Sequence, residues 1–219
     1  MTRRPLWSLV LLAAALPLAA AQAPSEAERL VFQHEHFAAT RAPETLRYLY
    51  VEDAQGQPRV NDSAVLRLAA GADGRCCDVV AEFLSGALAV NLPDIPGARS
   101  NPVLLYFLEG EVRRLQRTTK GQAAHFRRRI RQSLADSASV AATTIQWRGQ
   151  TVPARIVQVA PFVDDPFRVR FTDQAATTYA IVLADAVPGG VYQMRAELPG
   201  QPAGAAPLAR RTLTLAEAQ

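Results

Sequence analysis

The chain has 219 residues, of which 49% are hydrophobic and 20% are charged, and its formal net charge is +4. Without the first 21 of the 219 residues, which include Arg3 and Arg4, the remaining 198 carry +2, which is too small a surplus for a nucleic-acid-binding protein. That length fits one domain. The two cysteines, Cys76 and Cys77, are adjacent, which excludes a framework of disulfides.

The N-terminus has the pattern of a secretory signal peptide. Arg3 and Arg4 precede a short apolar run, which ends in small residues at Ala19 and Ala21. We therefore expect residues 1–21 to be a signal peptide that is cleaved after Ala21, and we expect the mature chain in the periplasm. The run is shorter than the about 20 apolar residues of a spanning helix, although a retained anchor helix is the alternative. No cysteine stands at the cleavage site, which argues against a lipid anchor.

Residues 22–40 are expected to form an N-terminal helix or arm, because Ser25 and Glu28 have the spacing of a capping box. Strand patterns then occur at 46–51, 63–70 and 76–84, and they are separated by turn sequences. On the third strand, Val79, Ala81 and Phe83 share one face. This spacing predicts an antiparallel meander of three strands.

Two helices are predicted in the middle of the chain, at about 102–118 and 121–135. Asn101 can cap the first helix, and Pro102 suits its first position. Apolar residues recur at spacings of three and four on both helices, which predicts one buried side on each. These residues are Leu104, Leu105, Leu108, Val112 and Leu115, then Ala123, Phe126, Ile130 and Leu134.

Strand patterns return after Asp136. Strands at 144–148 and 151–160 flank a turn at Gly149-Gln150. Residues 167–171 alternate apolar residues with arginines, which predicts a half-buried strand. Two further strands are expected at 177–184 and 191–198, a flexible linker at 200–208, and an additional edge strand at 211–215.

This order of elements predicts an α+β fold. We expect a curved antiparallel sheet of about seven to nine strands, with the two helices inserted mid-sequence and packed on one face. Residues 22–219 would form this single domain. A strongly curved sheet with a helical plug resembles the architecture of exported lipid and lipoprotein carriers of the LolA type. The resemblance lies in the order of the elements, without a residue-level motif, and it implies a carrier fold.

The predicted helices carry a local excess of positive charge. Between residues 102 and 135, eight basic residues face only Glu109 and Glu111. A basic amphipathic helix can bind an anionic membrane surface, and export excludes nucleic acid as the partner. The alternative is a solvated helix face whose arginines pair with acidic strand residues. The candidate contacts for a ligand or partner are Arg113, Arg117, Arg127, Arg128 and Arg131.

Two smaller clusters carry weaker functional signals. His34 and His36 would share one face of a strand and could chelate a metal, but metal sites use three or four ligands. We therefore expect surface histidines and no metal site. Asp164 and Asp165 are paired carboxylates before Pro166. Acid–base catalysis by this pair would require a second acidic residue nearby in space.

Cys76 and Cys77 are the candidates for thiol chemistry. Because neighbouring residues of a strand point to opposite faces, we expect two free thiols, one buried and one near solvent. The exposed thiol would be available for pairing between two chains. A disulfide between the adjacent cysteines is the alternative, and it requires an unusual backbone.

The sequence contains no nucleophile elbow, phosphate-binding loop or dinucleotide-binding motif. We therefore expect no catalytic residue and no cofactor. The leading hypothesis is a periplasmic binding or carrier protein of the cell envelope, which does not span the membrane after signal cleavage. Its ligand would be lipid-like or apolar, and its basic face would meet an anionic lipid or an acidic envelope protein. The alternatives are a structural or assembly factor of an envelope complex and a small carboxylate-dependent hydrolase.

Overall fold

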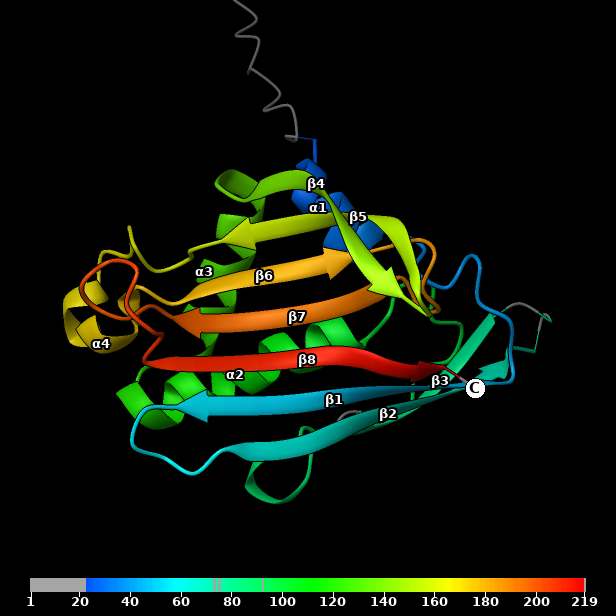
Figure 1. Cartoon of the computed structure of the whole chain (residues 1–219), viewed down its shortest axis with the longest axis horizontal. Helices are drawn as coiled ribbons and strands as arrows, with labels where there is room; N and C mark the ends of the chain where they lie inside the picture. Colours follow the sequence, from blue (N-terminus) through cyan, green and yellow to red (C-terminus); the bar gives the residue numbers. More distant parts are fainter. Residues whose placement is uncertain (1–22, 73, 75, 92, 219) are drawn as a thin grey trace, which may run out of the picture.

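The computed structural model describes residues 23–72, 74, 76–91 and 93–218, so the predicted signal peptide at 1–21 lies outside the described residues. Its main feature is one antiparallel sheet of eight strands in the order β3-β2-β1-β8-β7-β6-β5-β4 (Figure 1). The strands are β1 (Glu44–Ala54), β2 (Val60–Ala70), β3 (Cys76–Phe83), β4 (Ser139–Trp147), β5 (Gln150–Val159), β6 (Thr178–Leu183), β7 (Val191–Leu198) and β8 (Ala209–Ala218).

The sheet consists of two meanders that meet at β8. Strands β1 to β3 are consecutive neighbours, and so are β4 to β8. β8 pairs with β1 on one side, where Leu213 lies opposite Tyr50, and with β7 on the other. The predicted edge position of 211–215 is therefore wrong, because both sides of β8 are paired with neighbouring strands. The stretch 200–208, expected to be a linker, lies in the connection from β7 to β8.

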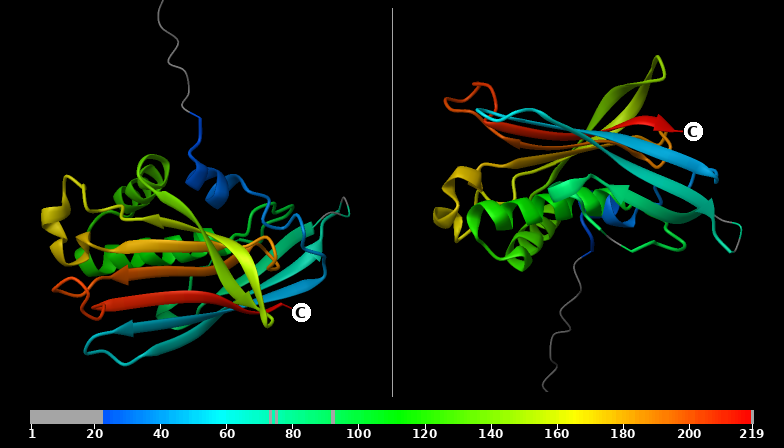
Figure 2. Two further views of the ribbon diagram at one scale, coloured as in Figure 1. Left: turned by 45° about the horizontal axis from the view of Figure 1, so that its top comes forward. Right: turned by 90° about the horizontal axis from the view of Figure 1, so that it is seen from below.

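Two helices cover one face of the sheet, as Figure 2 shows. Helices α2 (Val103–Thr119) and α3 (Ala123–Asp136) connect β3 to β4, which are the two outer strands. Asn101 Oδ1 accepts the Val103 N–H at 3.1 Å and so pairs one free N–H at the start of α2, although Pro102, predicted as the first helical residue, is the N-cap. The predicted α+β class, the number of strands and the placement of both helices are confirmed.

The buried stripes of the helices follow the prediction except at Leu105. Leu104, Leu108 and Leu115 are buried on α2, and Phe126 is buried on α3. Leu105 is 53% exposed. It is turned about 100° from Leu104 around the helix axis, which takes its side chain out of the stripe that faces the sheet.

Alternate strand residues point toward the helices and form the core. On β1, Tyr48 and Tyr50 are buried, whereas Leu49 between them is 50% exposed. Under α3, the rings of Phe126, Phe162, Phe171 and Tyr179 pack edge to face, with centroids 5.7–6.4 Å apart. Side chains thus fill the space between α3 and the sheet.

Short helical elements flank the main layers. α1 (Glu26–Glu28) has the predicted capping box and continues into the π-helix η1 (Arg29–Gln33). The 3₁₀-helix η2 (Gly86–Leu88) follows β3. The predicted strand at 167–171 is wrong, because η3 (Arg168–Arg170) and α4 (Thr172–Ala175) occupy this region. Asp165 accepts the Phe167 N–H at 2.8 Å and starts a tight turn there.

Candidate functional site

A pocket of about 160 Å³ lies between α2, the end of β3 and the inner face of β1. We call it the α2 pocket. A cavity of about 150 Å³ accepts one benzene molecule, so the α2 pocket suits one apolar group of that size. Its apolar lining includes Phe83, Leu84, Leu88 and Phe107, and its polar lining consists of Tyr50, Glu52, Glu111, Arg113, Arg114 and Arg117.

A glycine and a short loop shape the α2 pocket. A Cβ on Gly110 would make ordinary van der Waals contacts with Val90 and Phe83, at 3.8 and 4.0 Å, so the glycine leaves room on the pocket side of α2 for one small group. The loop at 84–90 is fixed at both ends, since the Val90 N–H donates to the Phe83 carbonyl at 3.0 Å. Asp62 Oδ2 accepts hydrogen bonds from the backbone and the hydroxyl of Ser85 at 2.8 and 3.0 Å.

A buried ion pair lies beside the pocket and joins α2 to β8. Arg211 Nε donates to Glu111 Oε1 at 2.6 Å, and Arg114 Nη2 donates to Glu111 Oε2 at 3.2 Å. Burial would raise the pKa of Glu111, but Arg114 and Arg211 outweigh burial and hold this pKa below its usual range. Glu111 is therefore a carboxylate, and both partners of the Glu111–Arg211 pair are withdrawn from water.

The mouth of the pocket is positively charged. Arg113 and Arg127 share Glu109, at 3.3 and 2.6 Å, and the hydrogen bonds from Arg127 lower the pKa of Glu109. Arg117 is exposed and makes no ion pair with any residue that the structure describes. Among the residues that line the pocket, the surplus is one positive charge, from Arg113, Arg114 and Arg117 against Glu52 and Glu111.

The structure separates the five arginines that the sequence proposed as contacts. Arg113 and Arg117 line the α2 pocket. Arg127 pairs with Glu109 where α2 meets α3, and it does not line the pocket. Arg128 and Arg131 are exposed on α3, away from the pocket lining. The five arginines therefore do not form one contact surface.

The buried pair of Glu111 and Arg211 is not among the residues predicted from the sequence. Both residues carried a signal for burial. Glu111 lies in the apolar stripe between Leu108 and Leu115, and Arg211 shares the inward face of β8 with Leu213. An acid and a base at two inward positions are expected to pair with each other.

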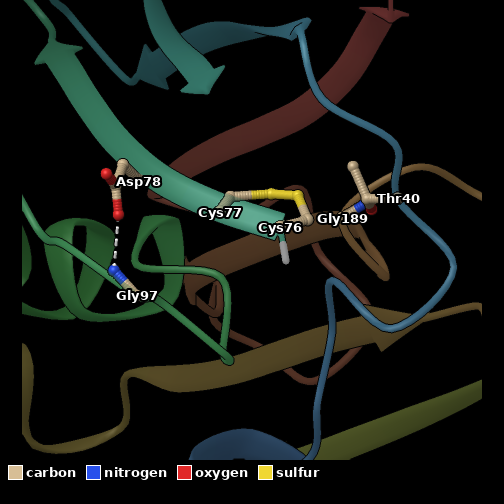
Figure 3. The surroundings of a disulfide bond; sticks show 6 residues. All are labelled: Thr40, Cys76, Cys77, Asp78, Gly97 and Gly189. Carbon is tan, nitrogen blue, oxygen red and sulfur yellow. Dashed lines mark hydrogen bonds between the residues drawn. A yellow bond between two sulfur atoms is a disulfide. The ribbon is translucent and has the colours of Figure 1, made fainter. Parts of the chain in front are cut away.

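The expectation of two free thiols is wrong, because Cys76 and Cys77 are joined in a disulfide (Figure 3). Cys77 is fully buried and Cys76 is partly buried at the start of β3. Next to them, Asp78 Oδ1 accepts the Gly97 N–H at 2.8 Å, which holds the segment after β3 along its outer edge. The disulfide leaves neither cysteine as a free thiol for pairing between two chains.

His36 is not a surface histidine. Its Nδ1 accepts the Asn101 N–H at 3.2 Å, and its Nε2 donates to the Leu30 carbonyl at 2.9 Å. Burial, reinforced by the charge of His34, lowers the pKa of His36 from 6.5 to about 4. Both ring nitrogens are thus occupied, which leaves neither of them for a metal. The described residues contain no group of three or more histidine, cysteine or acidic side chains placed to hold a metal ion.

Asp165 is used inside its own loop. Its Oδ2 accepts the His125 Nε2–H at 2.7 Å and lies 3.4 Å from Arg129 Nε, and its Oδ1 accepts the Phe167 N–H. Asp164 next to it is exposed. Because both oxygens of Asp165 hold the loop in shape, the geometry gives no support to a carboxylate pair with a catalytic role.

The chain was compared with protein-family models, curated proteins and solved structures. No protein-family model matches it, and no curated protein matches it in sequence. Among solved structures, it is similar to the crystal structure of the Mycobacterium tuberculosis lipoprotein LppX. The TM-score is 0.35 and the identity is 12%, with 88% of this chain and 95% of that chain covered. A likeness this distant carries no functional argument. No helix in the described ranges is long and apolar enough to cross a bilayer.

Proposed function

We propose that the protein is an exported, non-enzymatic binding protein of the cell envelope, and that its α2 pocket holds the apolar end of an acidic amphiphile. Phe83 and Phe107 provide an apolar wall, and Arg113 and Arg117 lie beside it. Arg113 shares Glu109 with Arg127, and Arg117 has no ion-pair partner among the described residues. This combination of an apolar wall and surplus positive charge carries the proposal. A carboxylate or phosphate headgroup would pair with the arginines while its tail enters the pocket.

The size of the pocket limits the ligand. About 160 Å³ takes a group near the size of benzene, and aromatic rings fill the space under α3. The protein would therefore hold the end of an amphiphile and would not enclose a whole lipid. Export rests on the signal-peptide pattern at 1–21, and a mature N-terminus at Gln22 in the purified periplasmic protein would support it.

The test compares octanoate with 1-octanol, which has the same chain without the charge. Binding to the mature protein is measured by NMR chemical-shift titration. We expect octanoate to bind about tenfold more tightly than octanol, because charge-assisted hydrogen bonds to arginine add affinity. Replacing both Arg113→Ala and Arg117→Ala should remove this difference. Arg131→Ala, on the same helical pair but outside the pocket, is the matched control.

A second pair of variants tests the pocket itself. Gly110 lines the pocket, so Gly110→Leu would add a bulky side chain to its wall, whereas the Cβ of Gly110→Ala makes only ordinary contacts. We expect the leucine variant to lose octanoate binding and the alanine variant to retain it. Equal affinities for octanoate and octanol, or octanoate binding that survives Gly110→Leu in a folded protein, would contradict the proposal.

A further inference from the structure

The loop between β5 and α4 exposes three apolar side chains at one end of the molecule. Val163 is 44% exposed, Phe167 is 47% exposed and Val169 is 75% exposed. We call these three side chains the apolar tip. In Figures 1 and 2 this segment lies at the end of the sheet that is opposite the C-terminal label. Three exposed apolar side chains on one short loop are a candidate interaction site, whereas single exposed apolar residues are common on any protein.

Hydrogen bonds to α3 and within the loop fix the segment that carries the apolar tip. Asp165 is 2% exposed and is bonded to His125 from α3 and to the backbone of Phe167. Arg129 of α3 donates to the Pro161 carbonyl at 3.1 Å. On either side of the tip, the buried rings of Phe162 and Phe171 enter the core. The loop is therefore attached at its base, and its apolar residues point away from an interior that already holds two of its rings.

Arginines surround the apolar tip. Arg168 Nη1 donates to the Val163 carbonyl at 2.7 Å, and the Arg170 guanidinium lies 5.3 Å from the centroid of the Phe167 ring. Arg128 reaches His125, whose ring packs against Phe167 at 5.5 Å.

The charge around the tip is positive. None of these three arginines makes an ion pair with a residue in the described part of the chain. Three arginines face two exposed carboxylates, which leaves a surplus of one positive charge, from Arg128, Arg168 and Arg170 against Asp164 and Asp173.

We propose that the apolar tip docks on the surface of an anionic phospholipid bilayer. The three apolar side chains enter the interfacial region, and the arginines remain at the level of the lipid phosphates. A projecting apolar group with cationic heads around it matches the layering of an anionic membrane surface, where phosphates lie above acyl chains. This inference does not depend on a ligand in the α2 pocket. The two regions are nonetheless connected, since Arg114 of the pocket donates to Gln174 of α4 at 2.9 Å.

The first experiment is co-sedimentation of the mature full chain with vesicles of phosphatidylcholine alone or with one quarter phosphatidylglycerol. We expect binding to the anionic vesicles, at least tenfold weaker in the double variant Phe167→Ser with Val169→Ser. The matched control is Leu49→Ser with Val80→Ser, which removes two exposed apolar side chains from the sheet. This control should bind vesicles as the unaltered protein does, and 0.5 M salt should weaken all binding.

A second readout covers the case in which the serine variant fails to fold. Val169→Trp is introduced in a Trp147→Phe background, so that the only tryptophan of the mature chain reports on the tip. Its emission should shift to the blue when anionic vesicles are added, and brominated lipids should quench it. No binding to anionic vesicles, equal binding by tip and control variants, or an unshifted emission would overturn the proposal. Octanoate affinity should be the same in the tip variants, so failure of the pocket and failure of the tip are distinguishable.

Discussion

Two arginines of helix α2 and two arginines of helix α3 lie in opposite environments. On α2, Arg113 and Arg114 are held by Glu109 and Glu111, and the second of these carboxylates is buried against β8. On α3, Arg128 and Arg131 are exposed and have no carboxylate partner among the described residues. The comparison teaches that an arginine count identifies a basic segment, whereas the positions of the acids decide which arginines stabilise the fold and which face a partner.

The substitution Glu111→Leu is expected to have the largest effect on the free energy of unfolding. It leaves the buried Arg211 guanidinium without its hydrogen-bonded partner and with only Glu52, 4.0 Å away, as a carboxylate, so we expect a loss of about 3 kcal/mol in the free energy of unfolding. Arg131→Leu on α3 should change it by less than about 0.5 kcal/mol. Urea denaturation measures both. Combining Glu111→Leu with Arg211→Met should recover most of the loss. A Glu111→Leu variant as stable as the Arg131→Leu variant would remove the distinction between arginines that stabilise the fold and arginines that do not.

Acidification tests how the start of α2 is fixed. His36 accepts the Asn101 N–H only while its Nδ1 is unprotonated, and burial lowers its pKa from 6.5 to about 4. The unfolded chain therefore binds this proton first. The His36 contribution is complete above pH 6.5 and is lost as the pH falls toward 4, by up to roughly 3 kcal/mol.

Urea denaturation at pH 7.5 and 4.5 measures this loss. His36→Gln should show a smaller loss between the two pH values than the unaltered protein does. The carboxylates of the chain titrate in both proteins. The difference between the two losses in the free energy of unfolding therefore isolates His36. An equal loss of unfolding free energy in both proteins would mean that His36 is already accessible to protons in the folded state.

Asn101→Ala tests the same end of α2 without a change of charge. Asn101 Nδ2 donates to Tyr48 Oη and to the Gly189 carbonyl, both at 2.9 Å, and Oδ1 caps Val103. Its loss leaves buried polar groups unpaired, and we expect a cost of about 2 kcal/mol. Thermal unfolding followed by circular dichroism measures this cost. A change below about 0.5 kcal/mol would show that water replaces the amide.

The smallest expected effect separates two neighbouring arginines of α3. Arg127 pairs with Glu109 near the surface, so Arg127→Ala should cost about 0.5 kcal/mol, and this cost should shrink at high salt. Arg128→Ala should cost nothing measurable. Unfolding in urea at 0.05 and 0.5 M salt compares them. Equal costs for the two variants would show that the Glu109 pair contributes nothing beyond a solvated charge.

The periodicity of apolar residues predicted most single helices and strands, but it did not predict where neighbouring residues turn the chain. The alternation at Val79, Ala81 and Phe83 and the stripe at Phe126, Ile130 and Leu134 predicted a strand and a helix correctly, because each pattern depends on one element. The alternation at 167–171 failed, because Asp165 turns the chain before a strand can begin.

The candidate site depends on contacts between distant segments, which sequence patterns do not report. Two of its arginines, Arg113 and Arg117, were proposed from charge alone. The pairing of Glu111 with Arg211 joins a helix to a strand 100 positions along the chain. The bond between Cys76 and Cys77 likewise requires a departure from the alternation of a regular strand.

The position of β8 makes the whole sheet sensitive to proteolytic clipping. β8 comes last among the strands, and it alone joins the meander of β1, β2 and β3 to the meander of β4 to β7. Cleavage that removes it would leave pieces of three and four strands, each with a newly unpaired edge, and would also take Arg211 from Glu111. A cut near residue 205 followed by loss of β8 would therefore disrupt the sheet more than a cut in a hairpin at the edge of the sheet.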